Sequence, residues 1–256
     1  MPRVEAPPRR AVLAFAVAAL SGCANLSGPI RKTMDVSYDD RACAGTQAPV
    51  LLVLLPGANM APAELEREGF VAAVRERRLA VDVAIADANL AYVYNGSVLQ
   101  HLHADVIAPA RAAGYRRIWL AGISLGGYVA LAYAQQHPGE IEGLLLTAPY
   151  LGRRPLVQAI VDAGGPAAWR RSAQPRDDSD IDHALWMWLS ALPTSAPPLW
   201  LGYGREDRFA ESHRLLARLL PAARVSSAPG RHDWPPWRAL WAQWLDGGLL
   251  PTSCAA

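Results

Sequence analysis

The sequence predicts an α/β fold, a mostly parallel sheet of about six or more strands with helices on both faces, and three observations support this prediction. Short apolar runs alternate with helical segments along most of the chain. The run at residues 50–55 is apolar throughout, which is typical of a parallel strand covered on both faces. Residues 117–128 read as a strand, a sharp glycine-rich turn and a helix in immediate succession. Such alternation favours a parallel sheet.

Length and composition are consistent with one such domain. The chain has 256 residues, of which 52% are hydrophobic and 19% are charged, and this balance suits a single large core. The formal net charge is only +2, so no basic surface is indicated and we expect no binding to nucleic acid. The sequence leaves the oligomeric state open.

The N-terminal residues 1–22 predict a signal peptide rather than part of the fold. Three arginines precede a ten-residue apolar run at 11–20, which is too short to span a bilayer as a mature helix. The run ends at Leu20-Ser21-Gly22-Cys23, which closely resembles the lipobox of bacterial lipoproteins. The resemblance implies cleavage before Cys23, a diacylglyceryl group on its sulfur and acylation of its new amine. The alternative is an ordinary secretory signal with a chance cysteine.

The lipoprotein resemblance also implies a location. In this family the residue after the lipidated cysteine influences sorting. Here it is Ala24 and not aspartate, so the resemblance implies a location at the outer membrane, facing the periplasm. Without residues 1–22 the chain has 22 basic and 22 acidic residues. Membrane attachment is therefore expected through the lipid rather than through a basic patch. We expect residues 23–49 to form a lipid-anchored tether and entry segment leading into one domain at 50–250.

The elements of this domain are predicted from apolar runs, charge order and breakers. A weakly alternating edge strand is expected at 34–38, and 87–96 is expected to be a loop. Glutamates early and arginines late in 63–78 suit a helix dipole. The predicted strands lie at 50–55, 81–86, 118–121, 141–148, 199–203 and 223–226, and the predicted helices at 63–78, 97–113, 128–136, 206–220 and 235–245.

The segment at 151–198 interrupts the alternation, because it contains no clear strand. A helix is expected at about 181–192. A structureless loop of this length is unusual in a compact domain. We interpret the segment as an inserted helical cap that shapes a pocket, and the alternative is a surface excursion without a role in the site.

The pattern Gly122-Ile123-Ser124-Leu125-Gly126 lies at the junction of the predicted strand and helix. This is the context of a nucleophile elbow, in which a serine on a strained turn exposes its hydroxyl above the sheet. Glycines two residues before and after the serine remove Cβ atoms that would clash there. Ser124 is therefore the predicted nucleophile.

A serine needs a base, and the base needs an orienting acid. Four histidines follow Ser124, and three of them are placed in a helix end, in the cap and within a predicted helix: His137, His183 and His213. His232 follows the last predicted strand, at the sheet edge where the elbow also lies, and is the predicted base.

The predicted acid is Asp207, because Gly204-Arg205-Glu206-Asp207 follows the preceding strand. Its alternative role is that of a helix N-cap, and the two roles are compatible. Glu206 is the rival acid, and Asp233 is too close in sequence to orient its own neighbour. Backbone N–H groups of Leu125 and of Ala58, in the turn after 50–55, are the predicted oxyanion donors.

These motifs together resemble the α/β-hydrolase fold family from Val50 to Leu245. The elbow matches, and the turns at 204–207 and 230–234 resemble the family's acid and histidine turns. Many members have His-Gly at the oxyanion strand, where this chain has Pro56-Gly57. The donor is a backbone group, so the departure changes neighbouring contacts rather than the donor itself.

The resemblance implies a serine hydrolase that cleaves carboxylic, acyl or lipid-like esters through Ser124, His232 and Asp207. A thioesterase or peptidase could use the same triad, and a lipid-anchored binding module without catalysis is a further alternative. We expect no cofactor and no metal, because no cluster of metal-ligating residues has ligand spacing and no loop has the pattern that cradles phosphate.

Two cysteines, Cys43 and Cys254, lie at the two edges of the folded part. Outside the cytoplasm a disulfide between them is permitted and would tie the ends of the domain together. The spacing does not decide between this bridge and two free thiols.

Overall fold

A computed structural model describes residues 29–173 and 180–254 of the chain. The predicted signal peptide and Cys23 lie outside the described residues. Within the described ranges, no helix is both long enough and apolar enough to cross a membrane.

The structure is built on a seven-stranded sheet with the order β1-β3-β2-β4-β5-β6-β7. All neighbouring strands are parallel except β1, which pairs antiparallel with β3 at the edge. The predicted mostly parallel sheet is therefore confirmed. The strands are β1 Val36–Asp39, β2 Val50–Leu55, β3 Val81–Ala86, β4 Arg117–Ile123, β5 Gly143–Thr147, β6 Leu199–Gly204 and β7 Val225–Ala228.

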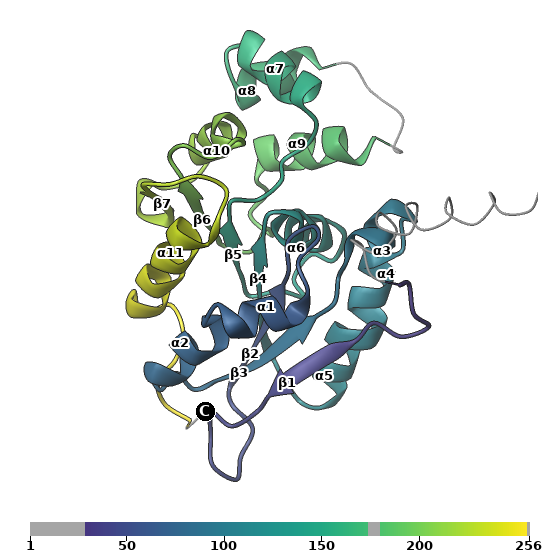
Figure 1. Cartoon of the computed structure of the whole chain (residues 1–256). Helices are drawn as coiled ribbons and strands as arrows, with labels where there is room; N and C mark the ends of the chain where they lie inside the picture. Colours follow the sequence, from purple (N-terminus) through teal and green to yellow (C-terminus); the bar gives the residue numbers. More distant parts are fainter. Residues whose placement is uncertain (1–28, 174–179, 255–256) are drawn as a thin grey trace, which may run out of the picture.

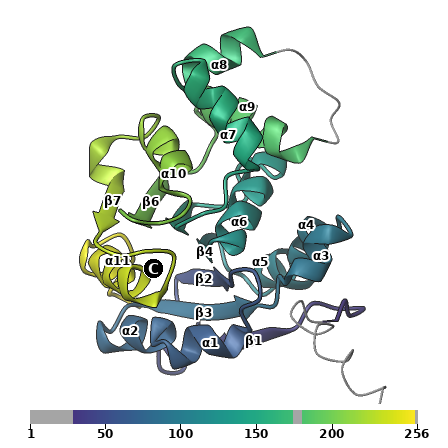
Figure 2. The ribbon, with the colours of Figure 1, turned by 45° about the horizontal axis from the view of Figure 1, so that its top comes forward.

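Helices cover both faces of this sheet (Figures 1 and 2). The helical segments are α1 Pro62–Arg67, α2 Phe70–Glu76, α3 Leu90–Tyr94, α4 Val98–His101, the π-helix η1 Leu102–Ile107, α5 Ala108–Ala112, α6 Leu125–Gln136, α7 Arg154–Asp162, α8 Pro166–Ser172, α9 Ile181–Ala191, α10 Ala210–Ala217, the short 3-10 turn η2 Ala222–Arg224 and α11 Trp234–Asp246.

The apolar runs of the central strands divide into two cores because successive side chains point to opposite faces of a sheet. Leu51, Val53 and Leu55 of β2 face a core that contains α4, η1, α5 and α6. Their neighbours Val50, Leu52 and Leu54 face a second core formed with α1, α2 and α11. Every residue of β2 is buried, which is why its sequence shows no polar alternation.

Three predicted elements differ from the structure. The helix expected at 63–78 is divided into α1 and α2 at Gly69, whose φ of 83° lies in the left-handed region that ends helices. The loop expected at 87–96 contains α3, because the Asn89 side chain accepts a hydrogen bond from the Ala91 amide and caps it.

The helix expected at 97–113 is interrupted by the π-helix η1. Pro109 explains the interruption, because proline lacks an N–H group and its ring would clash with the carbonyl four residues earlier in an α-helix. A π-helix shifts these carbonyls by one position, so the chain continues as α5 without a break.

The segment between β5 and β6 contains α7, α8 and α9 and no strand among its described residues. In Figure 1, α7 and α8 stand at the top, and α9 lies below them and above α6. Gln135 of α6 attaches the segment to the domain by donating to the Ala184 carbonyl at 3.2 Å. Within the segment, Trp186 is fully buried and donates from its indole N–H to the Leu151 carbonyl at 2.6 Å.

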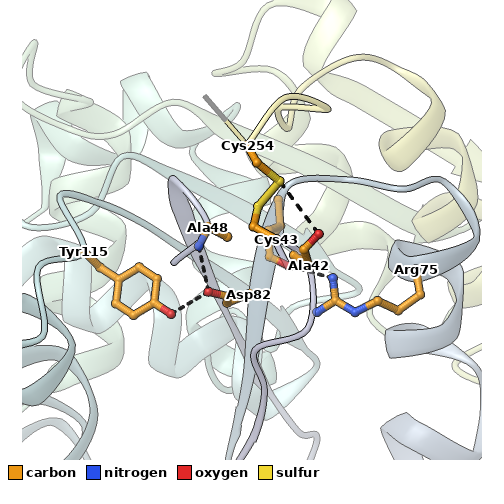
Figure 3. The surroundings of a disulfide bond; sticks show 8 residues. Ala42, Cys43, Ala48, Arg75, Asp82, Tyr115 and Cys254 are labelled. Carbon is orange, nitrogen blue, oxygen red and sulfur yellow. Dashed lines mark hydrogen bonds between the residues drawn. A yellow bond between two sulfur atoms is a disulfide. The ribbon is translucent and has the colours of Figure 1, made fainter. Parts of the chain in front are cut away.

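The two ends of the described domain are joined by a disulfide between Cys43 and Cys254 (Figure 3). The bridge spans 211 positions of sequence. Beside it, the buried Asp82 carboxylate accepts hydrogen bonds from the Ala48 amide at 3.0 Å and from the Tyr115 hydroxyl at 2.7 Å. These contacts fix the strand β3 to the segment that leads into β2.

We predict that the C43A/C254A double substitution lowers the free energy of unfolding by about 2–5 kcal/mol, because a cross-link over so long a loop strongly restricts the unfolded chain. Denaturant unfolding of oxidised protein measures the change. Wild type treated with a reductant is the matched control and should unfold like the double variant. Equal denaturation midpoints for oxidised wild type and double variant would contradict the prediction.

Candidate active site

Ser124 lies between β4 and α6, on a backbone that its neighbours hold in a strained conformation. Its φ is 51° and its ψ is −109°, a region that residues with a side chain rarely occupy. A Cβ on Gly122 would lie 2.3 Å from the Gly126 carbonyl carbon, and one on Gly126 would lie 2.0 Å from the Leu55 carbonyl oxygen. Both glycines are therefore required by close backbone contacts, as the elbow motif predicts.

The Ser124 backbone is also fixed by hydrogen bonds to three other segments. Its amide donates to the Thr147 carbonyl of β5 at 2.9 Å. Its carbonyl accepts from the Tyr128 amide at 3.2 Å and from the Tyr150 amide at 2.9 Å. These bonds compensate for the strained conformation and place the hydroxyl at the carboxyl edge of the sheet.

The structure brings the three predicted triad residues into one hydrogen-bonded chain. His232 Nε2 lies 2.9 Å from Ser124 Oγ, and His232 Nδ1 lies 2.7 Å from Asp207 Oδ2. An ionised carboxylate can only accept, so this network assigns the proton to Nδ1 and leaves Nε2 free to accept the Ser124 hydroxyl proton. The arrangement is that of a nucleophile, a base and an orienting acid.

Asp207 is held as a carboxylate although its side chain has no solvent exposure. Burial alone would raise the pKa of Asp207, but hydrogen bonds from His232 and from the Phe209 amide lower this pKa below its ordinary value. The amide bond, to Oδ1 at 2.8 Å, occupies the second carboxylate oxygen. The hydrogen bond from the Phe209 amide therefore orients the Asp207 carboxylate, and the hydrogen bond with Nδ1 orients His232.

The rival acids have other positions. The Glu206 carboxylate accepts a hydrogen bond from the Gly230 amide and so holds the loop that carries His232. Asp233 is the N-cap residue of α11. The geometry therefore selects Asp207 as the partner of His232, whereas its role in catalysis remains a prediction.

The other three histidines after Ser124 do not approach it. His137 ends α6, at the opposite end from Ser124. His183 lies in α9 of the cap and makes an edge contact with Trp169. His213 is fully buried in α10 and donates from Nε2 to the Pro149 carbonyl at 2.9 Å.

Aromatic rings surround His232 on two sides. Phe209 and Trp237 both meet the imidazole edge to face, at centroid distances of 5.2 and 5.0 Å. These contacts restrict the orientation of the imidazole and keep water away from its faces. The sequence places Trp237 in the last helix, but its contact with His232 depends on how that helix packs.

The predicted oxyanion donors lie at the same place. Leu125 is the first residue of α6, where backbone N–H groups have no partner within the helix. Gly57 lies so close to the elbow that a Cβ there would be 3.5 Å from Ser124 Cβ, and the adjacent Ala58 lines the cavity that contains Ser124. The positions fit an oxyanion hole, whose function remains a prediction.

A cavity of about 470 Å³ opens beside Ser124. Its walls are mostly apolar and aromatic, and they are formed by the elbow, by α3, by the segments after β5 and β6 and by the start of the cap helix α9. The lining residues are Ala58, Leu90, Val93, Tyr94, Ser124, Leu125, Tyr128, Tyr150, Ile181, Asp182, Arg208 and Phe209.

Sequence reasoning missed part of this wall. Leu90, Val93 and Tyr94 belong to α3, where a loop was expected, although Asn89 is an N-cap signal that indicates a helix start. Asp182 and Arg208 are the charged residues of the lining. Neither stands out in the sequence, because their approach to Ser124 depends on the placement of the cap and of the turn after β6.

Comparison with known proteins agrees with this fold. The family model described as serine aminopeptidase, S33, matches residues 98–177, a segment that contains the elbow. A search of curated proteins found no match.

Three solved structures resemble most of the chain. An S-formylglutathione hydrolase from Staphylococcus aureus is 16% identical with a TM-score of 0.52, over 85% of this chain and 99% of that one. Est1E from Butyrivibrio proteoclasticus is 14% identical with a TM-score of 0.55, over 84% and 92%. An alpha/beta hydrolase enzyme, MGS-MChE2, from a lagoon sediment metagenome of Mar Chica, Morocco, is 16% identical with a TM-score of 0.53, over 86% and 97%. At these identities the likeness concerns the fold.

Because His213 is buried, we predict that the free energy of unfolding depends on pH. Burial lowers the pKa of His213 to about 4, against an ordinary value of 6.5, although Asp207 and the Pro149 carbonyl partly oppose the change. Between these two pH values the unfolded chain binds a proton that the folded chain does not. As far as His213 is concerned, the free energy of unfolding is therefore highest above pH 6.5. It falls by up to about 3 kcal/mol as the pH is lowered towards 4.

Unfolding of wild type and His213→Gln at a series of pH values tests this prediction. The variant removes the titrating group, so its free energy of unfolding should fall less steeply between pH 6.5 and 4 than that of wild type. At pH 8, His213 is neutral in both the folded and the unfolded chain. The difference in free energy of unfolding between wild type and variant at this pH therefore measures lost packing and serves as the reference. Parallel curves over the whole range would show that His213 does not contribute.

Proposed function

We propose that this chain, which has the α/β-hydrolase fold, is a serine hydrolase that cleaves carboxylic esters. The observation that supports it most strongly is the chain of hydrogen bonds from Ser124 through His232 to Asp207. Ser124, at one end of this chain, lines a mostly apolar cavity. The matched family model and the similar folds described above are consistent with a hydrolase.

In the proposed reaction, the Ser124 oxygen attacks the ester carbonyl carbon while His232 Nε2 takes the hydroxyl proton. Asp207 stabilises the resulting imidazolium through Nδ1. The C–O bond to the alcohol then breaks, and His232 returns the proton to the departing oxygen. Water repeats the sequence on the acyl-enzyme and releases the carboxylic acid.

The negative charge that develops on the carbonyl oxygen would be stabilised by the amides of Leu125 and Ala58. Leu125 begins α6, whose N-terminal end has a partial positive charge. Donors that are already fixed by the fold require no reorganisation during the reaction. The bonds that fix the Ser124 turn therefore also fix one of the two proposed donors.

The cavity favours an apolar acyl or alcohol group of modest size. Its volume of about 470 Å³ lies in the lower part of the range of roughly 300–1,000 Å³ that is usual for small-molecule pockets. At its rim Tyr94 and Ile181 expose 80% and 53% of their surface, so apolar groups continue to the outside. Short and medium acyl chains therefore fit the enclosed part best.

The family match to serine aminopeptidases makes a peptidase the second candidate. Such an enzyme needs a group that binds the substrate's ammonium, and Asp182 is the carboxylate that lines the cavity. However, Asp182 Oδ2 already accepts hydrogen bonds from the Arg153 amide at 3.1 Å and from its guanidinium at 3.2 Å. This neutralisation favours an ester over a peptide with a free amine.

We predict that fluorophosphonate probes label wild type and that Ser124→Ala and His232→Ala abolish labelling, because no activated serine remains. Both substitutions should lower kcat on nitrophenyl esters by about 10³-fold or more, and Asp207→Asn by roughly 10³–10⁴-fold, since it changes the histidine tautomer. Acetate to palmitate esters and aminoacyl nitroanilides in parallel would distinguish ester from peptide cleavage.

Ser227→Ala is the matched control, because Ser227 is an exposed serine of β7 outside the site. It should label and turn over like wild type. If well-folded wild type is not labelled, the serine-hydrolase mechanism is wrong, and a lipid-anchored binding module becomes the better interpretation. Faster cleavage of aminoacyl nitroanilides than of every ester would favour the peptidase.

We also propose that Cys23 is lipidated and anchors the enzyme to the outer membrane, where it faces the periplasm. The proposal is supported by Leu20-Ser21-Gly22-Cys23 after an apolar run and by the absence of net charge in the remaining chain. A disulfide such as that between Cys43 and Cys254 is stable in that compartment.

We predict that protein expressed in a bacterial host incorporates radiolabelled palmitate and sediments with membranes, and that Cys23→Ala loses both properties. The C43A/C254A double variant is the control, and it should still incorporate label because it retains Cys23. Processed, soluble wild-type protein without label would identify an ordinary secretory signal instead.

A further inference from the structure

We propose that His103, His137 and Glu140 form a binding site for a divalent transition metal ion, and that the preferred ion is Zn²⁺. One ligand atom from each of the three side chains lies within 4.8 Å of the others. The cluster is far from Ser124 and takes no part in the proposed hydrolysis, so the inference goes beyond that function.

The ligand types suit zinc. Imidazole nitrogen and carboxylate oxygen are ordinary zinc ligands, at about 2.0–2.2 Å from the metal. His103 Nδ1 and His137 Nδ1 lie 3.4 and 3.5 Å from the two oxygens of Glu140. Each separation, measured to a different oxygen of Glu140, is close to the edge of a zinc tetrahedron, roughly 3.4 Å for such bond lengths, and small side-chain rotations would bring one oxygen to both histidines. Water would complete the coordination, because all three side chains are only partly buried.

The fold brings the three ligands together from two directions. His137 ends α6, and the turn through Gly139, whose φ is 83°, places Glu140 beside it, with the Glu140 amide donating to the His137 carbonyl at 3.3 Å. His103 comes from the π-helix η1, in the helical segment that packs against α6 (Figure 2). The His103 and His137 rings are stacked nearly parallel with their centroids 4.9 Å apart, so these side chains must rotate for both Nδ1 lone pairs to point at one ion.

A second layer of contacts orients Glu140. The Tyr133 hydroxyl donates to Glu140 Oε2 at 2.6 Å. This hydroxyl also lies 2.9 Å from His103 Nδ1. The Arg111 guanidinium binds the Glu140 main-chain carbonyl and fixes that loop. Outer contacts of this kind are typical of metal sites, where they set the orientation of histidine and carboxylate ligands.

Electrostatics also favours a cation at this position. The carbonyl groups at the end of α6 give it a partial negative charge, and the Glu140 carboxylate adds a full one, which outweighs the Arg111 guanidinium because that group is bound to the main-chain carbonyl of Glu140 rather than to its carboxylate. His103 Nδ1 would exchange its contact with Tyr133 for the metal.

The metal would join η1 to the end of the nucleophile helix. Ser124 lies at the other end of this 12-residue helix, about 18 Å away at 1.5 Å per residue. The ion is therefore too distant to take part in ester cleavage. Its expected effect is on stability, because an ion that binds only the folded chain shifts the unfolding equilibrium towards that state.

Calorimetric titration of purified, tag-free protein with Zn²⁺ at pH 7.5 tests the proposal. We expect one Zn²⁺ per chain, a rise in Tm with added Zn²⁺, and no effect of Mg²⁺, which prefers oxygen ligands. H103Q, H137Q and E140Q should each weaken Zn²⁺ binding by about tenfold or more. E140Q is isosteric, so it tests the site even if a histidine variant does not fold.

Two controls make the result specific. His101 precedes His103 by two residues and pairs with Asp105 at 2.8 Å rather than with the cluster, so H101Q should bind Zn²⁺ like wild type. Ser124→Ala should also bind like wild type, which separates this test from that of the hydrolase. Absence of saturable Zn²⁺ binding below about 100 μM, or equal affinity in wild type and all three ligand variants, would overturn the proposal and leave a hydrogen-bonded cluster that ends α6.

Discussion

The close backbone contact between the start of α6 and the end of β2 is the constraint on which the candidate site depends. Gly126 approaches the Leu55 and Pro56 carbonyl groups so closely that a Cβ would lie 2.0 and 2.6 Å from their oxygens. This contact lets the turn around Ser124 close with a positive φ and positions the Leu125 amide. It also brings the elbow against the turn after β2, which contains Ala58.

The parallel sheet then determines which distant residues can meet at Ser124. Strand ends that point in one direction deliver their following loops to one edge. Ser124 follows β4, Asp207 follows β6 and His232 follows β7, so three positions spread over more than 100 residues converge. The cap and α3 complete the site from outside the sheet, and they supply part of the apolar wall rather than the reacting groups.

Helix α6 has a partial positive charge at its N-terminal end and a partial negative charge at its C-terminal end. A polar cluster lies at each end. Its N-terminal end lies at Ser124, where an oxyanion would be stabilised. Its C-terminal end lies at His137 and Glu140, where a cation would be stabilised. The helix between them is almost wholly buried, so the core fixes the position of both of its ends.

The sequence by itself determined the parallel α/β architecture, the elbow at Ser124 and the candidates His232 and Asp207, because these follow from local patterns: apolar runs, glycine spacing and the loops after strands. It did not determine α3, the division of a helix at Gly69 or the π-helix. It also left open whether Cys43 and Cys254 pair, which the structure decides by placing the two ends of the domain side by side. Only the tertiary structure decided the cavity wall and the cluster at His103, because side chains far apart in sequence meet there through packing, which no local pattern records.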